Sequence, residues 1–366
     1  MKINSINHSA SKRIQNIKIQ EKELDKLIFP FNKHSIQSLE YKPFSRFSLA
    51  KSIDDVFDGN LSKTLNKILK DRNTGVAIIE PDIKNSKFDK DFLVKLSTGL
   101  AYLVGLPNFD LMTDKYYARF YVKHSDSSDS YLRKAYRNLD LHTDGTFVKE
   151  KTDWLLMTKM EETNVKGGES VLLHLDDWEH CEELSSDPVG KQNFVWSSPK
   201  SKNVGYKVEH PVFSKDGSGK PTISYIDQFP EPKNMEQGLF LQKLSDALEE
   251  SKNKITFPLT PGSTIFSNNY FWLHGRKPFK KDINLSRELL RIRGIFFWLI
   301  SIIPSIQPLI DTSKYATFFQ LCCINTTKKR WFYEFFWIFI NFDQVKKTSK
   351  KMTLRTRYAT SPLKLN

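Results

Sequence analysis

The spacing of apolar residues predicts two helices in the first third of the chain. In residues 53–70, and again in residues 89–104, apolar side chains recur every three or four positions, as on one face of a helix. The second pattern ends at Gly105, a residue type that often follows a last helical turn. Residues 74–80 are rich in β-branched side chains and predict a buried strand between the two helices.

Beyond residue 115 the pattern changes to short runs that are typical of strands. Turn-forming residues separate these runs, notably at 166–168 and 215–219. One further helical pattern covers residues 235–251. The expected strands are 116–122, 154–160, 170–175, 207–210, 222–226, 255–258 and 263–267.

Helices followed by many short strands favour a mainly β fold with flanking helices, either a β-sandwich or a jelly roll. The sequence contains no internal repeat and no linker rich in Pro, Gly or Ser, so one catalytic domain is the simplest organisation. We expect this domain in residues 31–298. A polar extension, residues 1–30, precedes it and carries a short strand near residues 27–29. A basic, aromatic tail, residues 299–366, follows it.

His142 and Asp144 are the first candidate metal ligands. Residues i and i+2 of a strand point to the same side, so both can reach one ion, and Gly145 lets the backbone turn away. His274 follows another apolar run and supplies a second imidazole. Two histidines and one carboxylate form the facial triad that holds Fe(II) and leaves positions open for a cosubstrate and O2. Zinc accepts the same ligands. In the alternative without a metal, His142 caps a turn and His274 packs near a core.

Three arginines follow the second histidine: Arg287, Arg291 and Arg293. Apolar residues at 289, 290 and 292 mark their segment as a buried strand rather than a solvated basic edge. Guanidinium is the preferred bidentate partner of a carboxylate. An oxygenase needs such a clamp for a dicarboxylate cosubstrate, whereas a hydrolytic zinc enzyme needs a general base. The arginines therefore favour iron and small dicarboxylates.

The distribution of charge argues against nucleic-acid binding. The chain of 366 residues has a net charge of +14, which would ordinarily favour a nucleic acid or a membrane surface. Residues 299–366 hold eleven Lys/Arg and three Asp/Glu, so +8 of this charge lies in the tail. The remaining +6 suits a solvated surface. Three cysteines without a C-x-x-C motif, and no apolar leader, predict a reducing compartment and a cytoplasmic protein.

Several collinear motifs lie between about residues 39 and 294. They are YYARF at 116–120, DSYLR at 129–133, LHTDGT at 141–146, GGES at 167–170, LLHLDDWEH at 172–180, YIDQF at 225–229 and FWLHGR at 271–276. Together they resemble the glutarate 2-hydroxylase (CsiD) family, which belongs to the Fe(II)/2-oxoglutarate-dependent dioxygenases of the clavaminate-synthase-like group. The resemblance implies a double-stranded β-helix (jelly roll) core and a homotetramer. It also implies hydroxylation of glutarate to L-2-hydroxyglutarate while 2-oxoglutarate and O2 become succinate and CO2.

The resemblance also implies roles for individual residues. His142, Asp144 and His274 match the iron ligands. Ser170 and Arg287 match the positions that hold the distal carboxylate of 2-oxoglutarate. Arg291 and Arg293 are candidates for the other cosubstrate carboxylate or for glutarate. The candidate anchors for glutarate are Arg119, Tyr117 and Tyr131. For Tyr225 and Asp227, a role in the site and a role in closing a turn both remain open.

The likeness stops after Gly294, where relatives usually end soon after the last strand. Three apolar runs follow, at 295–304, 317–324 and 331–340, and each is about half the length that spans a bilayer. We therefore expect no stable membrane span. The tail is either native or the product of an altered reading frame in an AT-rich gene. It also keeps open a second class of function, a degenerate, non-catalytic dicarboxylate-binding relative or a membrane-associated protein.

Overall fold

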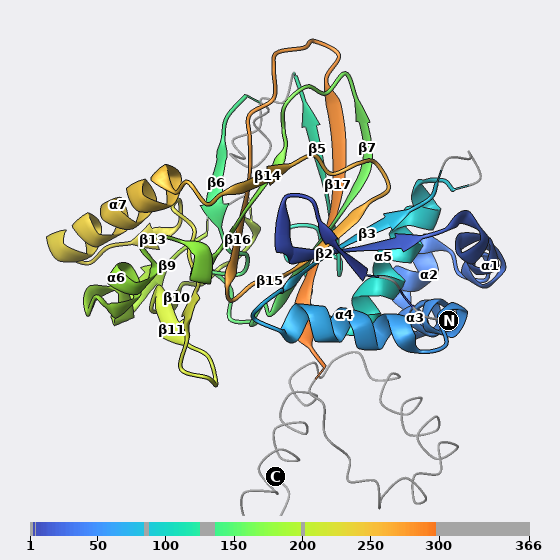
Figure 1. The fold of residues 1–366 in the computed structure, drawn as a ribbon, viewed down its shortest axis with the longest axis horizontal. Coiled ribbons are helices and arrows are strands. Elements are labelled where there is room, and N and C mark those ends of the chain that lie inside the picture. Colours follow the sequence, from blue (N-terminus) through green and yellow to red (C-terminus); the bar gives the residue numbers. More distant parts are fainter. Residues whose placement is uncertain (1–2, 4, 84–87, 125–135, 199–201, 298–366) are drawn as a thin grey trace, which may run out of the picture. The chain divides into compact units, whose positions relative to one another are not determined.

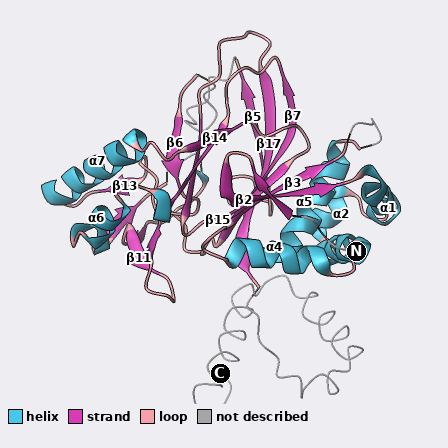
Figure 2. Cartoon of the chain, viewed as in Figure 1, coloured by secondary structure: helices cyan, strands magenta, loops and turns pink. Residues whose placement is uncertain are grey.

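The computed structural model describes residue 3 and residues 5–83, 88–124, 136–198 and 202–297. The chain divides into two units after Trp298, and the described residues all belong to the first unit. This unit is built on two sheets (Figures 1 and 2). The large sheet has the strand order β1-β2-β3-β15-β7-β17-β4, with β5 also paired to β17, and the small sheet has the order β14-β8-β16-β6.

The strands of the large sheet are β1 (Ser5–His8), β2 (Ser11–Ile19), β3 (Val76–Pro81), β4 (Gly105–Pro107), β5 (Ala118–Lys123), β7 (Trp154–Thr163), β15 (Thr264–Asn268) and β17 (Ser286–Phe296). The strands of the small sheet are β6 (Leu139–His142), β8 (Ser170–His174), β14 (Ile255–Phe257) and β16 (Trp272–Arg276). The pair β2–β3 is parallel, and the other pairs of these two sheets are antiparallel.

Helices cover the outer face of the large sheet (Figure 1). They are α1 (Glu21–Asn32), α2 (Ile36–Tyr41), α3 (Ser45–Val56), α4 (Asn60–Lys70) and α5 (Lys90–Val104). Leu65 of α4 and Leu100 of α5 pack in one buried cluster with Leu290 and Ile292 of β17. The side chain of Asp89 caps α5 by accepting a hydrogen bond from the Phe92 N–H at 2.8 Å. One face of β17 therefore packs against the helices.

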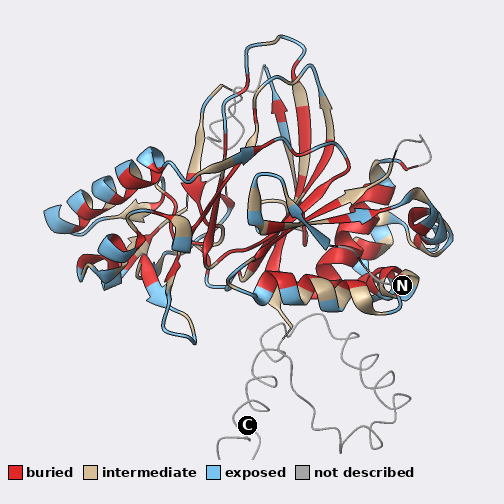
Figure 3. Ribbon diagram, in the orientation of Figure 1, coloured by how far each residue is buried: buried red, intermediate tan, exposed pale blue. Residues whose placement is uncertain are grey.

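The space between the two sheets holds a second buried cluster, and Figure 3 shows that much of the central strands is buried. Ile78 and Ile265 of the large sheet meet Leu172 and Trp272 of the small sheet there. Further elements extend this cluster beyond the small sheet. They are η2 (Leu175–Asp177), α6 (Cys181–Ser186), η3 (Val189–Lys191), β9 (Phe194–Trp196), β10 (Val208–His210), β11 (Phe213–Lys215), β12 (Pro221–Ile223), β13 (Pro230–Glu231) and α7 (Met235–Glu250). Two facing sheets with buttressing helices confirm the predicted mainly β, jelly-roll architecture.

The N-terminal residues differ from expectation. The strand expected near residues 27–29 is wrong, because these residues lie in α1, where Leu24, Leu27 and Phe31 are buried at helical spacing. The Glu23 carboxylate, which accepts from the Gln20 N–H at 3.1 Å, closes the first turn. Within the segment expected as an extension, β1 and β2 continue the large sheet.

The helix expected over residues 53–70 is two helices, α3 and α4. Asp58 and Gly59 both have left-handed backbone conformations, with φ of 51° and 72°, and the right-handed helix cannot continue through them. The apolar periodicity crosses this break because both helices pack on the same core. Among the described residues, no helix combines the length and apolar character that crossing a bilayer requires.

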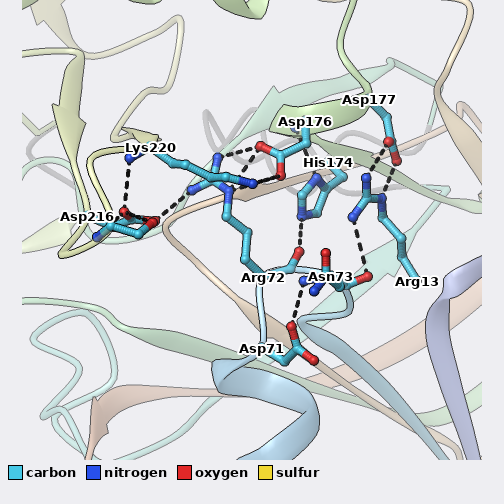
Figure 4. Close-up of polar contacts among 10 residues, drawn as sticks. Arg13, Asp71, Arg72, Asn73, His174, Asp176, Asp177, Asp216 and Lys220 are labelled. Carbon is cyan, nitrogen blue, oxygen red and sulfur yellow. Dashed lines mark hydrogen bonds and ion pairs between the residues drawn. The ribbon is translucent and has the colours of Figure 1, made fainter.

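A polar cluster ties the β8–η2 turn to three other parts of the fold (Figure 4). Arg13 of β2 pairs with Asp177 at 2.7 Å. Arg72 pairs with Asp176 at 2.7 Å and with Asp216 of the β11–β12 hairpin at 3.0 Å. His174, at the end of β8, contacts the Arg72 carbonyl oxygen through Nε2 at 2.9 Å. We call these residues, with Lys220, the β8 clamp.

Candidate metal centre

His142 is the last residue of β6, and Asp144 follows it in the adjoining turn. Thr143 between them points the other way, because its hydroxyl accepts from the Tyr225 N–H at 2.9 Å and its N–H donates to the Tyr225 carbonyl oxygen at 2.8 Å. This anchor directs His142 and Asp144 to the same side, as the His-x-Asp spacing predicts. The Tyr225 side chain itself is buried in the core, so this residue supports the site through its backbone.

His274 lies on β16 directly opposite His142 in the β6–β16 pair. Directly paired residues of antiparallel strands project to the same face, and the two imidazole centroids are 4.2 Å apart. One ligand atom from each of His142, Asp144 and His274 can be chosen so that all three lie within 4.8 Å of one another. The predicted ligands therefore converge.

The two imidazoles are prepared to bind a cation. The Nδ1 of His142 is 2.8 Å from the Asp140 carbonyl oxygen, which leaves Nε2 free of that contact and fixes the ring. The Nδ1 of His274 is buried without a hydrogen-bond partner. Burial, together with the neighbouring His142, lowers the pKa of His274 to about 3. His274 is thus neutral at physiological pH, the state in which it can bind a metal.

Asp144 is ionised in this pocket. Burial works to raise its pKa, but the charged guanidinium groups of Arg291 and Arg293 hold the pKa below its usual range. Asn269 fixes the backbone of Asp144 by accepting from its N–H and donating to its carbonyl oxygen, both at 2.9 Å. Gly145 turns the chain away with φ of 84°, and a Cβ there would lie 2.3 Å from the Thr152 hydroxyl. Two imidazoles and one carboxylate fit a divalent cation.

The predicted arginines share one face of β17. Alternation along this strand places Arg287, Arg291 and Arg293 opposite to Leu290 and Ile292, which face the helices. Arg291 reaches the metal ligands, with Nη1 3.2 Å from Oδ1 of Asp144. Its Nη2 donates to Oδ2 of Asp110 at 2.8 Å.

Arg287 lies further along β17, beside Val122, Phe279 and Leu285. It is 3% exposed, and its Nε and Nη1 have no hydrogen-bond partner. Burial lowers the pKa of Arg287 to about 10, which still leaves it charged at pH 7. A buried cation with unused donors is costly unless an anion joins it, so this position fits a carboxylate group.

Ser170 belongs to the same end of the sandwich. It pairs with Arg276 on β16, two residues beyond His274, and therefore projects to the same face as His274. The guanidinium of Arg276 lies 4.5 Å from the Phe279 ring centroid, and that of Arg287 lies 5.5 Å from it. Phe279 also packs on the Gly167–Gly168 turn just before Ser170. The predicted pair Ser170 and Arg287 is thus connected through Phe279 and Arg276.

A small pocket adjoins the ligand cluster. Charged residues line one part of it, and apolar residues such as Val148, Ile226 and Phe229 line another. A wider cleft shares Asp144, Gly145 and Val148 with this pocket and extends to β10 and β12. The ligand cluster is therefore reachable from outside the fold.

Two of the expected glutarate anchors have protein partners in this structure. Tyr117 donates to the Glu40 carboxylate at 2.7 Å and packs in the helix-side cluster. Arg119 is paired with Glu288, which also binds Lys90 of α5. Neither residue lines the pocket. The third candidate, Tyr131, lies outside the described residues.

Sequence reasoning missed two residues that support the site, Asp110 and Asn269. Asp110 follows a helix and a short strand in a loop without a recognised motif, and only the fold brings it to Arg291. Asn269 lies five residues before His274. The sequence signal for a role of Asn269 is the polar pair Asn268–Asn269, which interrupts an apolar run. Asp227 lies near Asp140, whose carbonyl oxygen contacts the His142 ring. Burial and the charge of Asp140 raise the pKa of Asp227.

The fold of this chain is shared with solved non-haem iron oxygenases. An asparagine oxygenase solved in complex with Fe(II), 2S,3S-3-hydroxyasparagine and succinate matches with a TM-score of 0.61 and 14% identity, over 76% of this chain and 93% of that chain. The non-haem iron oxygenase OrfP in complex with Fe and alpha-ketoglutaric acid matches with a TM-score of 0.58 and 14% identity, over the same shares. At such identity the likeness establishes the fold.

The sequence relationship is closer and names the family. The CsiD family model matches residues 3–296. A glutarate 2-hydroxylase of Klebsiella pneumoniae (strain 342) is 48% identical over 261 residues, 71% of this chain and 80% of that protein. One of Salmonella typhimurium (strain LT2) is 46% identical over 266 residues, 73% of this chain and 82% of that protein. The chain belongs to the CsiD family.

Proposed function

We propose that this protein is a glutarate 2-hydroxylase that uses Fe(II), 2-oxoglutarate and O2. The observation that carries the proposal is the convergence of His142, Asp144 and His274 beside a pocket that Arg291 and Arg293 line. The relatives' name supplies glutarate as the substrate. The products are L-2-hydroxyglutarate, succinate and CO2.

In this proposal His142, Asp144 and His274 hold Fe(II). With 2-oxoglutarate and O2, the bound iron supplies the oxidising power that replaces a C2 hydrogen of glutarate by hydroxyl. The protein has to hold the ligands and substrates in place and exclude water, and it needs no separate acid or base. Asn269 and the Thr143–Tyr225 contact fix the ligand-bearing turn. The charge on Asp144 and the neutral state of His274 keep the ligand set ready at physiological pH.

Different arginines bind different carboxylates of 2-oxoglutarate and glutarate. Arg287 and Ser170 hold the distal carboxylate of 2-oxoglutarate, since Arg287 has two donors without a partner. Arg291 and Arg293 take the other cosubstrate carboxylate or a carboxylate of glutarate. The apolar wall formed by Val148, Ile226 and Phe229 suits the methylene chain of a C5 diacid and displaces water from it.

Two further features belong to the proposal. The family resemblance implies that the protein acts as a homotetramer, and its cysteine pattern favours the cytoplasm. Light scattering after size-exclusion chromatography measures the oligomeric state. A monomeric protein with full turnover would contradict the proposed homotetramer.

The direct test is succinate release from 2-oxoglutarate, with and without glutarate, in protein reconstituted anaerobically with Fe(II) and then given O2. We expect glutarate-dependent succinate from the wild type and none above background from His142→Ala, Asp144→Ala or His274→Ala. Circular dichroism and thermal unfolding verify that each variant is folded. Normal iron binding and turnover by a folded Asp144→Ala variant would refute the ligand assignment. No turnover by the iron-loaded wild type would favour the non-catalytic alternative.

A further inference from the structure

Arg291 lies between two carboxylates. Its Nη1 is 3.2 Å from Oδ1 and 3.4 Å from Oδ2 of Asp144, whereas its Nη2 is 2.8 Å from Oδ2 of Asp110. The side chains of Arg291, Asp144 and Asp110 are only 13%, 10% and 7% exposed. Water therefore screens these charges poorly, and each carboxylate influences where the guanidinium settles.

The position of Asp110 is fixed by its own loop. Its N–H donates to the Lys115 carbonyl oxygen at 2.7 Å, and its Oδ1 accepts from the Met112 N–H at 3.1 Å. The Asn108 N–H donates to the Arg293 carbonyl oxygen at 2.7 Å, which fastens the start of this loop to β17. The second oxygen, Oδ2, remains directed at Arg291. Asp110 is thus a rigid acceptor beside the pocket.

A divalent cation held by His142, Asp144 and His274 would share the Asp144 carboxylate with Arg291. Two positive groups on one carboxylate repel each other, and the repulsion is strong where water is excluded. The guanidinium must then withdraw from at least one Asp144 oxygen. Asp110 offers it the nearer and shorter contact within the same pocket.

We propose that Asp110 is a positioning residue that draws Arg291 away from the metal ligand Asp144 and holds its guanidinium in the pocket wall, where it can receive a substrate carboxylate. This inference rests on the proposed function and adds a residue to it. Asp110 touches neither metal nor substrate and acts through Arg291. Partners that orient metal ligands in this indirect way typically change metal affinity by roughly 10- to 100-fold when removed.

The first readout is the dissociation constant for Mn(II), measured by electron paramagnetic resonance on the full chain without substrates. We expect Asp110→Asn to weaken Mn(II) binding by roughly tenfold, because Arg291 then interacts with Asp144 alone. Asp110→Glu keeps the charge and should recover part of the loss. Asp187→Asn is the matched control, since its carboxylate accepts from the Val189 N–H in η3 and should not affect binding.

The double variant separates positioning from general damage. In an Arg291→Gln background the competing cation is gone, so adding Asp110→Asn should have no further effect on Mn(II) affinity. The second readout is kinetic: Asp110→Asn should raise the KM for glutarate more than it lowers kcat. If Asp110 had a purely structural role, the losses of Mn(II) affinity in the two single variants would add up to the loss in the double variant.

Unchanged Mn(II) affinity in Asp110→Asn, or an equal loss in the Arg291→Gln background, would overturn this inference. If Asp110→Asn does not fold, Arg291→Gln alone decides, because weaker Mn(II) binding by that variant contradicts a competing role for Arg291. Failure of the proposed function gives a different result. In that case the wild type binds no Mn(II), or His274→Ala binds it equally well.

Discussion

At the scale of single residues, the proposed chemistry depends on two buried arginines, Arg287 and Arg291. Arg287 has two donors that no described residue accepts. Arg291 is divided between Asp144 and Asp110. A buried cation with incomplete partners is unfavourable for folding alone. In the proposed function, the carboxylates of 2-oxoglutarate and glutarate complete the site.

Arg287→Lys should raise the apparent KM for 2-oxoglutarate by roughly 10- to 100-fold, and that for glutarate much less. Lysine keeps the charge but loses the planar, bidentate fork. Steady-state kinetics with each substrate varied in turn measures both constants. Arg119→Lys is the control, because Arg119 pairs with Glu288 on the helix side of the sheet. Equal effects on both substrates, or an effect on glutarate alone, would move the cosubstrate clamp to Arg291 or Arg293.

The sequence predicted the convergence of the three candidate ligands but not the residues that support them. His142, Asp144 and His274 carry a spacing that has a direct structural meaning in strands. Asp110 carries no such local signal, because its role depends on a contact with a residue 181 positions away. The position of Arg119 in the fold could not be predicted from the sequence either. Its side chain follows the alternation of β5, and sequence alone does not reveal which face of that strand meets helices.

At the scale of elements, the Gly167–Gly168 turn packs on Phe279, and the Arg287 guanidinium lies over the ring of Phe279. Both glycines have positive φ, and a Cβ on Gly168 would lie 1.8 Å from the Phe279 ring. Gly168→Ala should therefore lower the free energy of unfolding by about 1–3 kcal/mol and raise the KM for 2-oxoglutarate. Gly217→Ala is the matched control, since a Cβ on Gly217 would meet no other atom within 4 Å. A variant as stable as the control, with an unchanged KM, would show that this turn tolerates a side chain.

The β8 clamp should make stability depend on pH. Burial, with the Arg13 charge, lowers the pKa of His174 to about 4 from the ordinary 6.5. The unfolded chain takes up this proton first, so stability present above pH 6.5 is lost progressively down to pH 4, at most about 3 kcal/mol. Urea unfolding at several pH values measures the slope.

His174→Asn, which keeps an acceptor for the Asp176 N–H, should be less stable at pH 7 and less sensitive to acid. The difference between wild type and variant isolates His174 from other groups that titrate in the same range. Equal slopes in the two proteins would mean that His174 does not titrate differently in the folded state.

At the scale of the whole molecule, the sequence predicted the layered architecture better than its N-terminal part. Short strands bounded by turn residues are local signals, and β7, β8 and β15 lie close to where the pattern places them. The strand β2 was missed because its burial comes from parallel pairing with β3, some sixty residues away. Such pairing leaves little trace in the local pattern, since only Ile14, Ile17 and Ile19 are buried along a basic segment.

The tail is expected to be dispensable for catalysis. The family match ends at residue 296, and the basic charge of the chain is concentrated beyond it. Truncation after Pro304 should give a protein that is more soluble and keeps whatever turnover the full chain shows. Sedimentation without detergent and glutarate-dependent succinate release measure both. Loss of folding or of iron binding would show that residues 305–366 support the domain, and an altered reading frame would no longer explain them.

The most direct measurement of the central claim is the fate of labelled oxygen. A turnover of 2-oxoglutarate and glutarate under 18O2, analysed by mass spectrometry, should place one labelled atom in 2-hydroxyglutarate and one in succinate. Both products should appear in equal amounts. Unlabelled 2-hydroxyglutarate, or labelled succinate formed equally well without glutarate, would contradict the account that this protein hydroxylates glutarate.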